Sequence, residues 1–152
     1  MNVLAIDTGN IESAYCLIEK ETYKCLKFGK IDNEELLHML KYDDFDADVC
    51  SIEMIASYGM AVGKEVFETC LWIGRFYERC NFDKVDYIYR KDVKMNICGN
   101  TRAKDSNIIQ ALKDRFGDKG TKKEPGWFYG FSKDVWQAYS VGVTQIDKLR
   151  GE

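Results

Sequence analysis

The sequence predicts an α/β fold in which helices cover a mixed β-sheet. Short apolar runs rich in β-branched residues alternate with longer segments whose apolar residues recur at helical spacing. The first three runs follow one another through short turns, which predicts an antiparallel meander. A helical segment separates them from the fourth run, so this strand can pair in parallel with the first through a crossover.

Ten elements account for most of the chain. We expect strands at residues 3–7, 13–19, 23–30, 48–54 and 87–89. Asn33 is an N-cap candidate for a short helix, Gly117 ends another, and Ser132 begins the last. The remaining helices are expected at 64–80, 91–97 and 103–116, with the last one at 132–147. Residues 118–131 read as an aromatic loop, and no linker divides residues 1–152, so we expect one domain.

Composition narrows the classes of function. The chain is 45% hydrophobic and 13% aromatic, which supports a core, and no segment predicts a membrane span or a signal peptide. We therefore expect a cytoplasmic protein. The six cysteines include no Cys-x-x-Cys pair and are predicted to be reduced core residues. The single histidine, His38, is expected on a helix surface, which argues against histidine-based catalysis or metal binding.

Charge is distributed unevenly along the chain. Residues 84–123 hold eleven lysines and arginines against five aspartates, whereas the rest of the chain has nine more acidic than basic residues. A basic segment in an acidic protein is typical of a site that binds a polyanion. It is also typical of a solvated helical face, and charge alone does not decide between the two.

Three acidic residues stand in unusual places. Asp7 ends an otherwise apolar strand, Glu53 is embedded in another, and Asp134 lies in the first turn of the last helix. Taken singly, Asp7 can be a turn residue and Asp134 can offset the helix dipole. If the two strands are neighbours, however, their carboxylates meet at one edge and repel unless a cation bridges them. Carboxylate oxygens without His or Cys favour Mg²⁺ or Mn²⁺, two of which can support phosphodiester cleavage.

Four motifs resemble one family. AIDTGN, SIEM, KMNICGNTRAKDSNIIQAL and KDVWQAYSVGVT occur in this order over nearly the whole chain. Together they are similar to the RuvC-type Holliday junction resolvases of the RNase H-like superfamily, and most closely to the short versions carried by bacteriophages. The resemblance implies an RNase H-like mixed five-stranded sheet flanked by helices, a homodimer, and a Mg²⁺-dependent endonuclease that nicks branched DNA in a bacterial or phage-infected cell.

The resemblance also implies roles for individual acids. Asp7, Glu53 and Asp134 match the family's first-strand, middle-strand and last-helix acids. Gln137 stands where the family usually has a fourth acid. Because Gln offers a neutral oxygen, we expect up to two ions per site, one of them weakened, and Mn²⁺ can support activity better than Mg²⁺.

The DNA-binding residues follow from the same resemblance. Lys94 and Lys104 match family lysines near the scissile phosphate, and Lys104 is expected to offset charge in the transition state. The family's stacking ring falls on Ala56, so Tyr58 is the nearest candidate. Further contacts are expected from Lys91, Arg102, Lys122 and Lys123, and the rival stacking rings are Trp127, Phe128, Tyr129 and Phe131.

Dimerisation is expected to use one face of the long helix at residues 64–80, through Phe67, Leu71, Gly74 and Tyr77. Two alternatives to a junction endonuclease remain. DTGN after a first strand also occurs in actin-like ATPases and sugar kinases, but that fold needs two domains, for which 152 residues are too few. A protein that binds branched DNA without cleaving it, through a degraded metal site, is the other, and Gln137 favours it.

Overall fold

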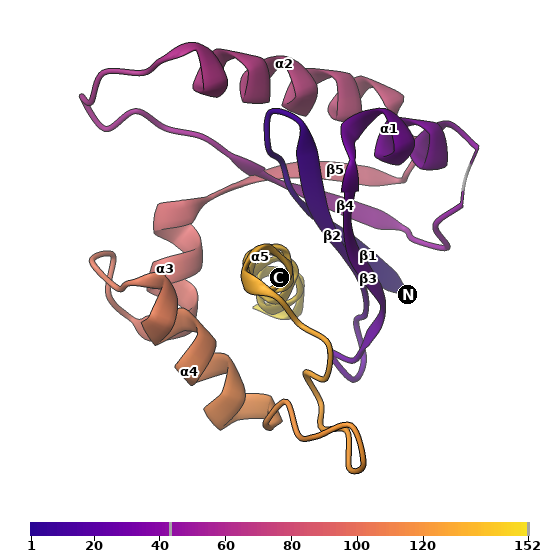
Figure 1. Cartoon of the computed structure of the whole chain (residues 1–152), viewed down its shortest axis with the longest axis vertical. Coiled ribbons are helices and arrows are strands. Elements are labelled where there is room, and N and C mark those ends of the chain that lie inside the picture. The colour runs from indigo at the N-terminus through magenta and orange to yellow at the C-terminus, as the bar shows by residue number, and fades with distance from the viewer. Residues whose placement is uncertain (43, 152) are drawn as a thin grey trace.

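A computed structural model describes residues 1–42 and 44–151. It contains a five-stranded sheet in the order β3-β2-β1-β4-β5 (Figure 1). The strands β1 and β2, and β2 and β3, are antiparallel, whereas β4 is parallel to both β1 and β5. The predicted mixed sheet with its meander and crossover is therefore confirmed. The strands are β1 Asn2–Asp7, β2 Glu12–Glu19, β3 Cys25–Asp32, β4 Val49–Met54 and β5 Lys84–Tyr89.

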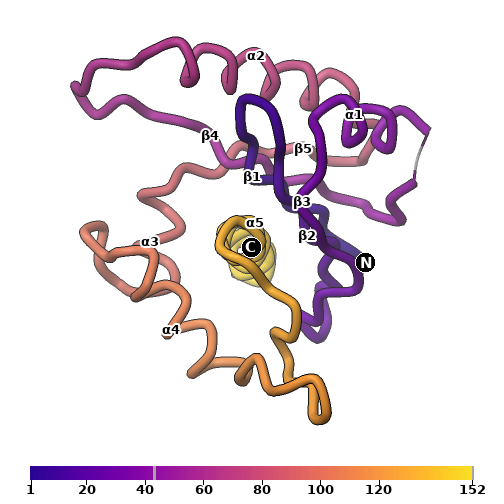
Figure 2. The backbone as a smooth tube through the Cα atoms, viewed as in Figure 1, coloured from indigo at the N-terminus to yellow at the C-terminus, as the bar shows by residue number. Residues whose placement is uncertain are grey.

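Helices cover both faces of this sheet (Figure 1). One face packs against α1 and α2, and the other packs against α5, with α3 and α4 lying beyond it. The backbone trace in Figure 2 shows the loop from β4 leading away from the sheet before α2 returns over it. The helices are α1 Asn33–Lys41, α2 Lys64–Arg79, α3 Arg90–Cys98, α4 Asp105–Phe116 and α5 Lys133–Gly151.

The strand β1 lies in the middle of the sheet and has no exposed face. Val3 and Ala5 point to the core under α5, whereas Leu4 and Ile6 point to the core under α1 and α2. This explains why the run is apolar at every position rather than alternating. The parallel register ends with Ile6 beside Ile52, so the two chains leave the sheet together at the residues that follow.

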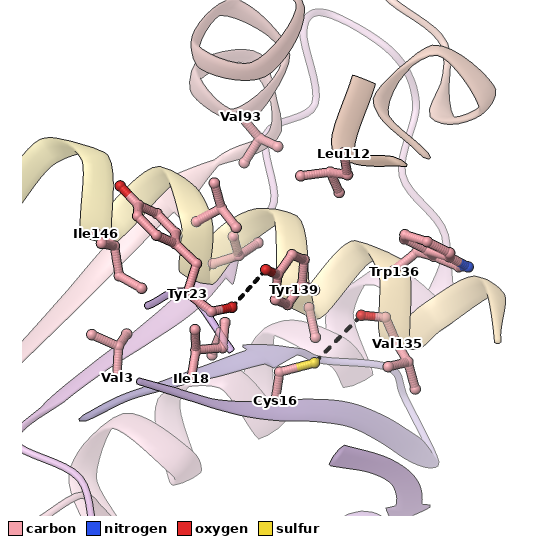
Figure 3. Packing of buried hydrophobic residues seen from close by; sticks show 14 of the residues in the cluster. Val3, Cys16, Ile18, Tyr23, Val93, Leu112, Val135, Trp136, Tyr139 and Ile146 are labelled. Carbon is pink, nitrogen blue, oxygen red and sulfur yellow. Dashed lines mark hydrogen bonds between the residues drawn. The ribbon is translucent and has the colours of Figure 1, made fainter. Parts of the chain in front are cut away.

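The helix α5 lies close against the sheet. A Cβ at Gly142 would overlap the end of the Ile18 side chain of β2 and crowd the Ala5 Cβ of β1, so the lack of a side chain permits this close approach. In Figure 3 the Tyr139 hydroxyl donates to the Tyr23 carbonyl at 2.7 Å, and the Cys16 thiol donates to the Val135 carbonyl. These contacts hold the first two turns of α5 against β2, the neighbour of the strand that carries Asp7, and against the turn after β2.

One carboxylate joins α5 to the basic segment. Asp147 accepts two hydrogen bonds from Arg115 of α4, each 2.9 Å long, and one of 2.8 Å from Asn96 of α3. The Tyr23 hydroxyl adds a fourth at 2.5 Å. Asp147 therefore ties α3 and α4 to the same helix that carries Asp134 in its first turn.

Several element boundaries differ from those expected. The α1 N-cap is Asp32 rather than Asn33, because Asp32 accepts the Glu34 N–H while the buried Asn33 amide bonds with Ser13 and Gly9. In α4 the N-cap is Lys104, so the helix begins at Asp105, two residues after the expected start. The strand β5 begins at residue 84, three residues before the expected start, and α5 continues beyond 147 to residue 151.

The remaining expectations on composition can be compared directly. His38 is exposed on α1, as predicted. All six cysteines are free, but only Cys16 and Cys50 are buried and the other four are half-buried. In the aromatic loop, Phe128 and Phe131 are buried and pack on α5, which makes them core residues. Within residues 1–42 and 44–151, no helix is long and apolar enough to cross a membrane.

Candidate functional site

The carboxyls of Asp7 and Glu53 meet at one edge of the sheet. Asp7 is the last residue of β1, and Glu53 is the next-to-last of β4. Burial raises the pKa of Asp7 well above its usual range, and the charges of Glu53 and Asp134 raise it further. Burial also raises the pKa of Glu53, although Arg90 opposes this. The two carboxyls are therefore close enough to influence each other's protonation.

Asp134 lies beside this pair but has a different partner. Its Oδ2 is 2.6 Å from the Lys30 Nζ atom, and this hydrogen bond raises the pKa of Lys30. Asp134, Lys30 and Asp7 line a common cavity of about 370 Å³, which we call the carboxylate cavity. Lys30 therefore neutralises the acid that the sequence assigned to the metal site.

Gln137 follows Asp134 by three residues on α5, and its side chain is buried. Neither atom of its amide finds a hydrogen-bond partner among the residues that the structure describes. A buried amide without partners costs free energy, which makes the Gln137 side chain a candidate ligand. Its carbonyl oxygen is a ligand type that Mg²⁺ accepts.

The donor set fits a hard divalent cation. Two half-buried carboxyls that repel each other favour a bridging ion because it removes their repulsion, and Gln137, one turn after Asp134, has an amide oxygen without a partner. Asp134 is available only if Lys30 releases it. Accordingly, within residues 1–42 and 44–151 no three His, Cys, Asp or Glu side chains already converge as an ion-binding group.

Arg90 connects the acids to the basic segment. Its Nε lies 3.9 Å from Glu53 Oε1, and its Nη1 donates to the Ser140 Oγ at 3.5 Å. Its Nη2 donates to Asp105 at the start of α4. The sequence analysis assigned Arg90 no role, although its position directly after β5 and beside Lys91 was a usable signal.

A second cavity, of about 340 Å³, has Arg90 in its lining. It is lined by Tyr58, Arg90, Lys91, Lys94 and Thr101, and we call it the basic cavity. Tyr58, Lys91 and Lys94, which the sequence analysis selected separately, thus share one cavity. Tyr58 is 63% exposed and has φ 49°, a left-handed conformation that is uncommon outside glycine.

The other predicted DNA-binding residues are all exposed. Arg102 and Lys104 lie just before α4, and Lys104 precedes the Asp105 that contacts Arg90. Lys122 and Lys123 lie in the turn around Gly120 and Pro125. In the described part of the chain, neither of these two lysines lines the carboxylate cavity or the basic cavity.

Known structures share this arrangement of elements. The structure of Thermus thermophilus RuvC superposes with a TM-score of 0.71 at 13% identity, over 99% of this chain and 97% of that one. The fold is that of RuvC. T. thermophilus RuvC in complex with a Holliday junction substrate gives a TM-score of 0.70 at 11% identity, with 99% and 96% coverage. No family model and no curated protein matches the chain.

The RuvC fold explains why the predicted acids come together. Parallel pairing of β1 and β4 brings Asp7 and Glu53 to one edge, and the first turn of α5 brings Asp134 beside Asp7. Lys30 was missed because it lies on an edge strand, 104 residues before its partner. No local pattern in the sequence connects these two positions.

Proposed function

We propose that this protein is a metal-dependent, structure-selective endonuclease that nicks Holliday junctions and other branched DNA. The observation that carries the proposal is the half-buried, mutually repelling pair of Asp7 and Glu53, joined through Arg90 to a cavity lined by lysines. Buried carboxyls with raised pKa values at the edge of a basic surface are typical of phosphodiester-cleaving sites.

Asp7, Glu53, Asp134 and Gln137 are the residues that would hold Mg²⁺ or Mn²⁺. Bound there, up to two such ions would activate a water and neutralise the leaving oxygen. Lys30 balances the Asp134 charge in the free protein and would have to turn away when this carboxylate becomes a ligand. Asp7, whose pKa is raised, would have to lose its proton to hold an ion, so metal affinity would rise with pH.

The basic residues would hold and orient the DNA. Lys91, Lys94 and Arg102 bind backbone phosphates, and Lys104 offsets charge that develops at the scissile phosphate. Lys122 and Lys123 contact a more distant part of the DNA. Tyr58 stacks on a base opened at the junction, since its ring is exposed beside the basic cavity.

A homodimer would supply two such sites. On α2, Thr69, Ile73 and Phe76 face the sheet, whereas Phe67 and Leu71 are 61% and 69% exposed. Gly74 and Tyr77 are exposed as well. Pairing these faces about a two-fold axis would present two active sites to a four-way junction, as symmetric nicks require.

One gel tests the activity. A synthetic four-way junction, a flap, a fork and a linear duplex are incubated with the protein and Mg²⁺, beside the Asp7→Asn variant. We expect nicks in the branched substrates, none in the duplex, and loss of nicking in the variant. Equal cleavage of flaps, forks and junctions indicates a general debranching enzyme, which suits a phage-borne version. Cleavage that survives the substitution would remove Asp7 from the mechanism.

A second candidate function is binding of branched DNA without cleavage. It is favoured by Gln137, which carries no charge, and by the ion pair that occupies Asp134. The same gel distinguishes the two candidates, because this protein would shift the junction but nick none of it in Mg²⁺ or Mn²⁺.

A further inference from the structure

Arg90 has three partners in three different elements. It is the first residue of α3, and its side chain is only 20% exposed. Its guanidinium approaches Glu53 of β4, Asp105 of α4 and Ser140 of α5. Because each partner meets a different nitrogen, one partner can be exchanged while the other two hold the group in place.

The basic cavity offers this guanidinium an anionic partner. All five lining residues are basic or uncharged, namely Arg90, Lys91, Lys94, Tyr58 and Thr101. A planar guanidinium binds a phosphate through two parallel hydrogen bonds, which a lysine cannot reproduce. A backbone phosphate in this cavity would therefore compete for the nitrogen that now donates to Asp105.

Asp105 is well placed to be displaced. Its side chain is 50% exposed, so its carboxylate regains water easily and the ion pair adds little stability. Asp105 is also the first residue of α4, where the helix N-terminus stabilises a negative charge. Releasing it therefore costs less than breaking a buried pair would.

We propose that Arg90 binds a DNA backbone phosphate next to the active site, and that Asp105 holds its guanidinium until this phosphate displaces the carboxylate. The inference rests on the proposed function, since it takes branched DNA as the ligand. Glu53 and Ser140 keep the guanidinium aimed, so the arriving phosphate lies beside the acid pair. The Asp105 carboxylate acts as an internal competitor of DNA.

The test measures binding of a synthetic four-way junction in EDTA, where no cleavage occurs, by electrophoretic mobility. Asp105→Asn removes the competitor, and we expect it to bind the junction about three- to tenfold more tightly than the unaltered protein. Asp114→Asn is the matched control, because it removes the same charge from α4 at a residue that bonds Gln110 instead. Arg90→Gln should bind about tenfold more weakly and with a shallower salt dependence.

The double variant gives the decisive comparison. If Asp105 acts through Arg90, adding Asp105→Asn to Arg90→Gln produces no tightening beyond that of Asp114→Asn. Arg90→Lys keeps the charge, and its junction affinity should lie between those of the unaltered protein and Arg90→Gln. If Arg90→Gln does not fold, Arg90→Lys takes its place in the comparison. If Asp105→Asn bound the junction no more tightly than Asp114→Asn does, the proposed displacement of Asp105 by a phosphate would be overturned. If the unaltered protein bound no junction at all, the proposed function itself would fail.

Discussion

Asp7 and Glu53 are placed where the fold alone would not favour them. A buried carboxyl beside another loses solvation and gains repulsion, and both effects raise the pKa of Asp7. The Arg90 charge, 3.9 Å from Glu53, offsets only part of this cost. Residues that lower the stability of the folded protein are typical of functional sites, where binding of a ligand offsets that cost.

The raised pKa of Asp7 predicts a pH-dependent cost to stability. Because the folded-state pKa lies above the unfolded value, the protonated carboxyl favours folding at low pH, and this contribution is lost as pH rises through the folded-state pKa. Without metal, Asp7→Asn should therefore raise the free energy of unfolding at pH 7 by about 1–2 kcal/mol. Urea unfolding in EDTA measures this, and the gain should shrink toward pH 4. A loss of stability at pH 7 would contradict it.

Under the proposed function, Gln137 would set the number of metal ions that bind well. Its buried amide brings an oxygen without charge, so the second ion should bind weakly. Gln137→Asp should tighten Mg²⁺ binding at the weaker site by about tenfold, as measured by calorimetric titration. Gln137→Asn, which stays neutral, is the control and should not tighten it. Two tight and equal Mg²⁺ sites in the unaltered protein would refute the prediction.

At the scale of elements, α5 is held by its close approach to the sheet. A Cβ at Gly142 would collide with Ile18, whereas one at Gly74 of α2 would meet nothing within 4 Å. Gly142→Ala should therefore destabilise the protein by about 1–3 kcal/mol through overpacking. Gly74→Ala is the matched control and should stabilise by about 0.5–1 kcal/mol, because alanine favours a helix. Urea unfolding of both variants measures these changes. If both substitutions raised the free energy of unfolding equally, α5 would be able to shift away from the sheet without cost.

The sequence predicts elements better than it predicts partners. Asp7 and Glu53 could be paired from the sequence because an apolar run that ends in an acid is conspicuous, and a crossover places two such ends together. Lys30 could not be found, because a lysine on an edge strand is ordinary and its partner is distant in sequence. The N-cap of α1 shifted by one residue because Asp32 and Asn33 are equally good capping types.

At the scale of the whole molecule, the two faces of the sheet differ in the residues gathered on them. The face under α5 carries the acids, with α3 and α4 adding the basic residues beside them. The face under α1 and α2 is covered more thinly, and α2 presents apolar side chains outward. Exposed apolar residues in a row on one helix mark an interaction site more often than isolated ones do.

The outward face of α2 predicts a dimer that one charge can break. Leu71 is 69% exposed and lines a cavity of about 330 Å³ together with Leu37, Gly74 and the charged residues Arg75, Glu78 and Arg79. Leu71→Glu should convert a dimer to a monomer in sedimentation at micromolar concentration, because two buried glutamates would face each other across the two-fold axis. Leu26→Glu on β3, where leucine is 48% exposed, is the control and should leave the dimer intact. With Leu71→Glu, junction cleavage should change from paired to single nicks. If the unaltered protein sedimented as a monomer even with junction DNA, the proposed α2 interface would be contradicted.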